Sequence, residues 1–228
     1  MRVLRAAGVT GARGARGTVV VIDVLRAFTT AAYAFASGAR TIELVATPEE
    51  GLARKRADPA LLLVGEVGGR PIPGFDHGNS PERMAELDLT GRTVVLRSSS
   101  GVQGALSAAP TAEHVLLGSL VTASATAGAA RALGRDVVLV AMGSPDGPDG
   151  PEDEACAVLL EALLRGDPPD LERVVRDVRA SPAGRQALDP AIDWITPGDL
   201  ERALAVDRFD FALEARLEGR RLLARPRT

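Results

Sequence analysis

Short runs rich in β-branched residues alternate with alanine-rich runs along most of this chain, and this alternation restricts its possible folds more than any other feature. The runs that favour strands lie at 18–23, 41–46, 61–65, 93–96, 114–117 and 136–141. The runs that favour helices lie between them, at 26–37, 48–57, 103–108 and 121–133. Strands that alternate with helices form right-handed βαβ crossovers, which build parallel sheets between helix layers. The sequence therefore predicts an α/β fold with a mostly parallel sheet flanked by helices.

Both ends of the chain carry further predicted elements. They are an edge strand at 1–9, a flexible turn rich in glycine and arginine at 11–17, helices at 152–165, 171–179 and 183–188, and a hairpin at 209–225. The chain has no fixed-period repeat and no clear linker. We therefore expect one domain over 1–228, in which 166–228 is the segment most able to form a C-terminal sub-lobe.

Composition argues against several classes of partner. The net charge is -3 and aromatic residues make up 3% of the chain, which favours neither a phosphate backbone nor base stacking. No apolar run approaches the roughly 20 residues that span a bilayer, and the first residues lack the pattern of a secretory leader. Cys156 is the single cysteine, which favours a cytoplasmic location. We expect a cytoplasmic protein without nucleic-acid or membrane partners, and its alanine-rich helices and edge strand favour a homodimer.

The first predicted strand runs directly into an acid and an arginine. Four β-branched residues at 19–22 suit a strand buried on both faces, and Asp23 and Arg26 follow it. Open α/β sheets bind ligands beyond the carboxyl ends of their strands, so these two residues lie where a site is expected. The alternative is that Asp23 caps the next helix and Arg26 is exposed in its first turn. The loops that follow the other predicted strands favour the first interpretation, in which Asp23 and Arg26 belong to a site.

A long loop after the third predicted strand carries glycines, acids and an amide. It runs from Glu66 through Asp76 to Asn79 and Ser80, and about 15 residues without secondary structure is a length typical of functional loops. Ser80 and Pro81 also have the pattern of a helix start, with an N-cap followed by proline in the first turn. Both interpretations of this segment stay open.

The loop after the fourth predicted strand combines an arginine with three hydroxyls and a glycine. Its members are Arg97, Ser98, Ser99, Ser100 and Gly101. A turn of this kind before a helix predicts an anion cradle, because free backbone N–H groups and the helix dipole both favour negative charge. The arginine fork matches phosphate or sulfonate oxygens. The lysine and spacing of a P-loop are missing, so nucleotide binding is not implied.

A cluster of five acids invites a divalent cation. It consists of Asp146, Asp149, Glu152, Asp153 and Glu154. Its spacing differs from an EF-hand loop, and the last three acids also suit the first turn of a helix. Carboxylates on one side, with arginine, serine and N–H groups on the other, are what metal-assisted hydrolysis of a small phosphate ester requires.

These motifs, in this order, resemble the 2-phosphosulfolactate phosphatase family, the ComB-like proteins. The matching pieces are 22–27 with 29–30, 65–69, 74–81, 117–124 and 152–157. The resemblance implies a magnesium-dependent phosphatase with an α/β fold of its own. The family's reaction removes phosphate from 2-phospho-3-sulfolactate to give 3-sulfolactate, a step toward coenzyme M. Two segments depart from the family: 99–102 reads Ser-Ser-Gly-Val in place of Thr-Asn-Gly-Thr, and 141–143 reads Ala-Met-Gly in place of Cys-Ala-Gly.

With this resemblance, the candidate residues receive roles as hypotheses. The catalytic candidates are Asp23, Arg26, Glu66 and Asp76; the candidate Mg²⁺ ligands are Asp23, Glu66 and Asp153; and the substrate-binding candidates are Asn79, Ser80, Arg97, Ser98, Ser99, Ser100 and Gly101. Direct attack by water is the favoured mechanism, with Asp23 as a phosphoryl acceptor the alternative. Two further functions stay open: hydrolysis of another phosphorylated hydroxy acid, such as phospholactate or phosphoglycolate, and non-catalytic anion binding on the same fold.

Overall fold

A ten-stranded sheet forms the centre of the protein in the computed structural model, which describes residues 1–143 and 150–227. Its strands are β1 (Val3–Ala7), β2 (Thr18–Ile22), β3 (Thr41–Leu44), β4 (Leu62–Val67), β5 (Arg70–Pro71), β6 (Thr93–Arg97), β7 (His114–Gly118), β8 (Val137–Ala141), β9 (Ala212–Glu218) and β10 (Arg221–Arg227). The helices are α1 (Gly8–Ala12), α2 (Ala27–Ala36), α3 (Pro48–Ala57), α4 (Pro81–Glu86), α5 (Gly101–Ala108), α6 (Ala123–Ala132), α7 (Pro151–Arg165), α8 (Leu171–Arg179), α9 (Pro182–Leu188) and α10 (Pro197–Ala203), with a 3₁₀ turn at Leu120–Thr122. The predicted α/β fold is confirmed.

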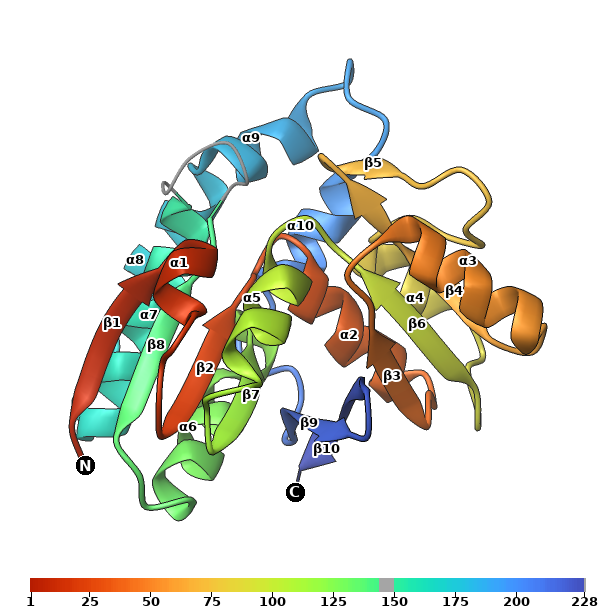
Figure 1. Ribbon diagram of the computed structural model, residues 1–228. Helices are drawn as coiled ribbons and strands as arrows, with labels where there is room; N and C mark the ends of the chain where they lie inside the picture. Colours follow the sequence, from red (N-terminus) through yellow and green to blue (C-terminus); the bar gives the residue numbers. More distant parts are fainter. Residues whose placement is uncertain (144–149, 228) are drawn as a thin grey trace.

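The sheet consists of two parallel groups joined by the C-terminal hairpin. One group contains β1, β8, β2 and β7, and the other contains β3, β6 and β4. The hairpin β9–β10 lies between them, antiparallel to β7 on one side and to β3 on the other. Figure 1 shows the two groups inclined toward each other, so that the carboxyl ends of β2 and β6 converge. The last elements of the chain therefore connect the two halves of the sheet.

The residues of β2 are buried on both faces of the sheet, which explains its run of β-branched side chains. Val19 and Val21 pack toward α2 and α5, in a core shared by both parallel groups. Val20 and Ile22 point to the opposite face, where α6, α7 and α8 cover the first group. A strand covered on both faces has no solvent-exposed side, so its residues do not alternate between apolar and polar, as is typical of parallel sheets. This burial fixes the position of Asp23, the next residue.

Two sequence predictions need correction. The flexible turn predicted from 11 onward begins as a helix, because α1 follows β1 directly. The prediction that 66–80 lacks secondary structure is wrong, since β4 continues to Val67 and turns through Gly68 and Gly69 into β5. Both glycines have positive φ (57° and 84°), the conformation that tight hairpin turns require. Helix α10 was not predicted at all. None of the described helices is long and apolar enough to cross a membrane.

Candidate active site

The carboxylate of Asp23 lies between the first turns of two helices. Its Oδ1 accepts a hydrogen bond from the N–H of Ala27 in α2 (2.9 Å), and its Oδ2 accepts one from the N–H of Gly101 in α5 (2.8 Å). The side chain is 5% exposed. One oxygen of Asp23 therefore bonds the first N–H of α2, as the capping interpretation expects, although the N-cap residue itself is Arg26. The second oxygen connects β2 to the turn after β6, which a helix cap alone does not require.

Burial raises the pKa of Asp23 from 3.8 to about 6. The two backbone hydrogen bonds lower the pKa, but desolvation outweighs them and the nearby charges of Glu66 and Glu152 raise it further. A carboxylate held next to other acids in a buried position is costly for folding, and such groups concentrate at functional sites.

Asp153 places a second carboxylate beside the loop that follows Asp23. It lies in the first turn of α7 and accepts hydrogen bonds from the N–H groups of Val24 (2.7 Å) and Gly143 (2.9 Å). Desolvation, and then the charge of Asp23, raises the pKa of Asp153 well above its ordinary value. Burial likewise raises the pKa of the neighbouring Glu152. The first turn of α7 therefore supplies acids to the site, whereas Asp146 and Asp149 lie outside the described residues.

The serine turn after β6 binds carboxylates of the protein itself. The N–H of Ser99 donates to Glu66, whose other oxygen accepts from the N–H of Gly69 (2.6 Å) and from the Ser99 hydroxyl (3.1 Å). The N–H of Gly101 is used by Asp23. The turn therefore binds carboxylates of the protein, since two of its N–H groups hold Glu66 and Asp23, and the binding of a substrate anion there stays a prediction.

The serine side chains of this turn are also engaged. The Ser98 hydroxyl accepts from the N–H of Val102 (3.0 Å) in the first turn of α5, and the Ser100 hydroxyl donates to the carbonyl of Gly143. Arg97 donates to the Ser99 hydroxyl (2.9 Å), while its Nε is buried and has no partner among the described residues. The turn therefore orders the site, and the Nε–H of Arg97 is its unsatisfied donor.

Arg26 is buried in the same region. It is 5% exposed, which excludes the alternative that it is solvated in the first turn of α2. Its Nη2 donates to the carbonyl of Gly69 (2.9 Å) and its Nη1 to the carbonyl of Trp194. Burial lowers the pKa of Arg26, while the charges of Asp199, Glu66 and Asp23 raise it. Arg26 therefore lies within electrostatic reach of the carboxylates.

Three other candidate residues have different surroundings. Asn79 is 3% exposed, and its Oδ1 has no partner within the described part of the chain. The Ser80 hydroxyl accepts from the N–H of Arg83 as the predicted N-cap of α4, and donates to Asp199 (2.6 Å). Asp76 pairs with Lys55 (2.9 Å) and accepts from the N–H of Leu63 in β4 (2.7 Å). Asp76 thus makes no contact with the buried carboxylates among the described residues.

A metal site is not preformed in the described residues, where no three His, Cys, Asp or Glu side chains are grouped so as to hold an ion. Asp23, Glu66 and Asp153 are instead tied to backbone N–H groups from three different loops. Each of the three carboxylates keeps lone-pair capacity beyond these bonds, although Oε2 of Glu66 already accepts two.

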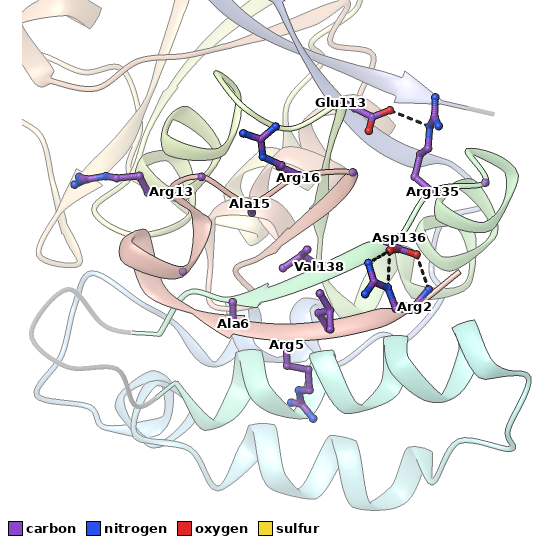
Figure 2. A pocket seen from close by; sticks show the side chains of 15 residues that line it. Arg2, Arg5, Ala6, Arg13, Ala15, Arg16, Glu113, Arg135, Asp136 and Val138 are labelled. Carbon is purple, nitrogen blue, oxygen red and sulfur yellow. Dashed lines mark hydrogen bonds and ion pairs between the residues drawn. The ribbon is translucent and has the colours of Figure 1, made fainter.

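The groove of about 780 Å³ in Figure 2 lies away from these carboxylates, between β1, the 11–17 segment and the start of β8. It is lined by arginines, most of which have acidic partners: Arg2 pairs with Asp136 (2.6 Å) and Arg135 with Glu113 (2.9 Å). These acids compensate much of the positive charge in the groove. The groove therefore does not compete with the converging strand ends as a catalytic centre.

Replacing Gly101 with alanine is expected to destabilise the protein, because a Cβ there would lie 2.5 Å from Oδ2 of Asp23. We expect a loss of about 1–3 kcal/mol in the free energy of unfolding, as for other overpacked positions. Gly128→Ala is the matched control, since its Cβ would meet nothing within 4 Å in α6 and alanine favours a helix. Equal urea midpoints for the two variants would contradict the close contact between Gly101 and Asp23.

The raised pKa of Asp23 predicts a pH-dependent stability. Below pH 3.8 the group is neutral in both states, and between pH 3.8 and about 6 the unfolded chain ionises first. Ionisation then disfavours the folded state by about 3 kcal/mol at neutral pH. The free energy of unfolding of Asp23→Asn, relative to the native chain, should therefore increase from pH 4 to pH 7. Urea unfolding in EDTA-containing buffers measures it; a difference that does not change with pH would refute the raised pKa.

The fold and the site together define an α/β protein that gathers buried acids and arginines at converging strand ends, a combination suited to the chemistry of small anions. The chain belongs to the 2-phosphosulpholactate phosphatase family, whose model matches residues 6–184. The carboxylates described above fall within this range. Trp194 and Asp199, which contact Arg26, lie beyond it.

Three similar proteins carry the same description, "Probable 2-phosphosulfolactate phosphatase". The protein of Deinococcus radiodurans is 42% identical over 146 residues, which cover 64% of this chain and 61% of the relative. That of Bacillus subtilis is 39% identical over 148 residues, 64% of each protein. That of Thermus thermophilus is 39% identical over 175 residues, 75% of this chain and 73% of the relative. The matches thus span less than two thirds of the first two relatives.

Sequence reasoning missed Asp199, which is fully buried and hydrogen-bonded to Ser80. The available signal was Thr196-Pro197 with Asp199 at the third position of the helix, a helix-start pattern that gives no indication of a site. Its contacts with residues more than a hundred positions earlier could not be read from the sequence.

Proposed function

We propose that this chain is a magnesium-dependent phosphatase that hydrolyses 2-phospho-3-sulfolactate to 3-sulfolactate and phosphate, the reaction type of coenzyme M biosynthesis. One observation carries the proposal: a chain of this family brings Asp23, Glu66 and Asp153 together with Arg26 and Arg97 where its strand ends converge. Phosphoryl transfer depends mainly on positioning and on stabilising negative charge, which such a site can provide.

The donor set suits a hard cation. The pKa of Asp23 is raised first by burial and then by the charges of Glu66 and Glu152, and a bound cation would relieve this repulsion. Mg²⁺ commonly uses one or two carboxylates, water and substrate phosphate, so a cage of three side chains is not required. Asp23 and Glu66 would hold the ion, with Asp153 supporting the loop of Asp23. When bound, Mg²⁺ would neutralise charge on the phosphoryl oxygens and lower the pKa of water.

The arginines supply the groups that would bind the substrate's anions. Arg26 has five N–H donors, and the described residues accept three hydrogen bonds from it. The buried Nε of Arg97 adds a donor, and the Nδ2 group of Asn79 would add another, whereas the unpartnered Oδ1 of Asn79 is an acceptor. A substrate with phosphate, sulfonate and carboxylate groups needs several such donors, which a neutral ligand would leave unsatisfied.

In the reaction, a water molecule attacks phosphorus directly, a P–O bond to water forms, and the bond between phosphorus and the lactate oxygen breaks. Asp23 orients the water and accepts its proton, and the leaving oxygen takes up a proton, from Asp23 or from solvent, to become the hydroxyl of 3-sulfolactate. Burial raises the pKa of Asp23 to about 6, which suits a group that accepts a proton near neutral pH and favours this route. An aspartyl-phosphate on Asp23 is the alternative, and its trapping with borohydride would refute the direct attack.

Phosphate release from a panel of esters tests the proposal. The panel contains 2-phospho-3-sulfolactate, phospholactate and phosphoglycolate, each with Mg²⁺ or with EDTA. We expect the highest kcat/KM for 2-phospho-3-sulfolactate, and a loss of activity in EDTA. Higher values for either of the other esters would identify the second candidate substrate class. No release from any ester would favour the non-catalytic anion-binding protein, an alternative kept open by Ser100 and Val102.

We also propose a cytoplasmic homodimer. Cys156 is free and fully buried, which is compatible with a reducing compartment. Strand β1 lies at one end of the sheet and presents Leu4, 49% exposed, on its surface. Light scattering measures the mass in solution, and a monomer at micromolar concentration would contradict the dimer.

A further inference from the structure

We infer that Asp199 is a positioning residue that holds Arg26 in the orientation that binds the substrate's anionic group, so that helix α10 completes the active site. The inference rests on the proposed function and adds to it a residue outside the part of the chain that matches the family model.

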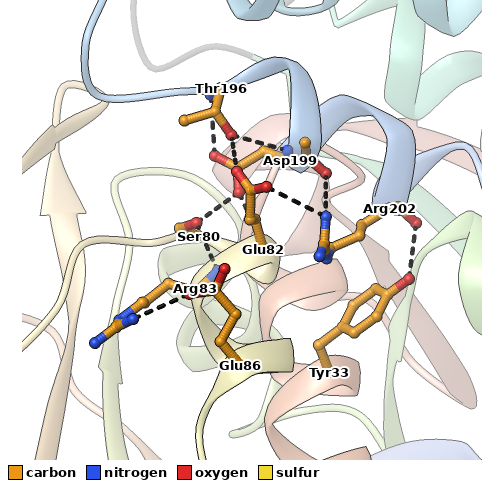
Figure 3. A network of polar contacts seen from close by, with 9 residues as sticks. Tyr33, Ser80, Glu82, Arg83, Glu86, Thr196, Asp199 and Arg202 are labelled. Atoms are coloured by element: carbon orange, nitrogen blue, oxygen red, sulfur yellow. Dashed lines mark hydrogen bonds and ion pairs between the residues drawn. The ribbon is translucent and has the colours of Figure 1, made fainter.

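Asp199 is fully buried and all of its contacts are made inside the protein. Its Oδ1 accepts from the Ser80 hydroxyl (2.6 Å) and from the N–H of Glu82 (3.1 Å). Its Oδ2 accepts from the N–H of Thr196 (3.2 Å) and lies 3.4 Å from Nη1 of Arg26. Figure 3 shows this carboxylate at the centre of a polar network between α4 and α10. Asp199 therefore joins three segments, one of which carries Arg26.

The guanidinium of Arg26 is held on several sides by acceptors. Besides Asp199, the carbonyl of Trp194 accepts from Nη1 and the carbonyl of Gly69 accepts from Nη2. The remaining two of its five N–H groups have no partner among the described residues. Fixing one end of the planar fork determines where the other donors point, because the group is rigid.

Asp199 also determines which acid Arg26 pairs with. Glu66 and Asp23 attract the same guanidinium, although Asp199 exerts the strongest attraction of the three. A buried arginine without Asp199 would gain most by turning its free donors toward Glu66 and Asp23, since an unpaired buried charge is costly. It would then occupy the carboxylates of the site and lose its donors for the substrate. The buried pair with Asp199 prevents this rearrangement.

Asp199 also belongs to the capping box of α10, and a role in capping that helix is the structural alternative to positioning Arg26. The side chain of Thr196 accepts from the N–H of Asp199, and Asp199 accepts from the N–H of Thr196. A helix start of this kind needs no arginine and no anion. The two roles are separable, because Thr196→Val removes the threonine side of the cap and the hydrogen bond from its hydroxyl to Glu82 (2.6 Å), but keeps the Asp199 carboxylate and its bond from the N–H of Thr196.

The test is a double-mutant cycle with Asp199→Asn and Arg26→Lys, in which both phosphate release and binding of inorganic phosphate by calorimetry are measured. We expect Asp199→Asn to raise KM and the Kd of phosphate by about 10-fold or more, the weight of one charge-assisted hydrogen bond. In the Arg26→Lys background the same substitution should change both constants less than 3-fold, because the interaction it removes is already lost. Thr196→Val should lower Tm and leave KM within 3-fold.

Three results would overturn the inference. Asp199→Asn could lower Tm as Thr196→Val does, with KM and Kd unchanged, which would make Asp199 a helix cap only. Its effect could be equally large with lysine at position 26, which would show that it does not act through Arg26. The native chain could fail to bind phosphate, which would leave Arg26 nothing to be positioned for. Phosphate binding without phosphatase activity, lost in Asp199→Asn, would refute the proposed function while supporting the positioning role.

Discussion

Asp23→Asn is expected to lower kcat for phosphate release by about 10³-fold, the middle of the range for loss of a catalytic acid or base. The substitution keeps the size of the side chain but removes the charge that would hold Mg²⁺ and accept the proton of water. It also replaces one acceptor by a donor opposite the N–H of Ala27 or Gly101. Steady-state phosphate release with saturating Mg²⁺ measures the effect.

Asp136→Asn is the matched control for this experiment. Asp136 accepts from the backbone and side chain of Arg2 near the start of β8, far along the strand from the candidate site. Its substitution should leave kcat within 2-fold of the native value. If Asp23→Asn retained more than a tenth of native kcat, the carboxylate at the end of β2 would not be catalytic.

Arg26→Lys is expected to lower kcat/KM by about 10²-fold, mainly through KM. Lysine keeps the charge but has no planar fork, so it cannot hold Gly69, Trp194 and a substrate anion together. A difference of this size corresponds to about 3 kcal/mol, within the range for charge-assisted hydrogen bonds. Initial rates over a range of substrate concentrations separate KM from kcat.

Arg54→Lys serves as the control for Arg26. Arg54 also pairs with a buried acid, Glu43 (2.8 Å), but it lies in α3. Its substitution should leave KM unchanged. Equal losses in the two variants would mean that the effect at Arg26 reports general stability and not substrate binding.

The alternation of strand-favouring and helix-favouring runs predicted the fold, because the residue types of each run suit the positions that they occupy in the structure. The β-branched residues of β2 are buried on both faces, as their pattern indicates, and Pro48 and Pro81 start helices as their positions indicate. The place of the C-terminal hairpin between β7 and β3 could not be predicted, because it depends on pairings between residues about a hundred or more positions apart. Sequence patterns are local, and such pairings are not.

The same distinction between local patterns and distant contacts applies to the candidate site. Asp23, Glu66 and Asp153 were identified because acids at strand ends and at a helix start are visible in the sequence, and the structure places all three in one buried region. The partners of the serine turn were not predicted, since a free N–H group and one bound to a distant carboxylate look alike in sequence. Asp199 was missed for the same reason. Residue types could be predicted, but their partners depend on the tertiary fold.

The most direct test of the central claim is a crystal structure of the protein with Mn²⁺ and inorganic phosphate, in which anomalous scattering locates the metal. We predict a metal ion bound to Asp23 or Glu66, and phosphate in contact with Arg26 or the Nε of Arg97. Metal and phosphate found only in the arginine-lined groove between β1 and the 11–17 segment would contradict the account.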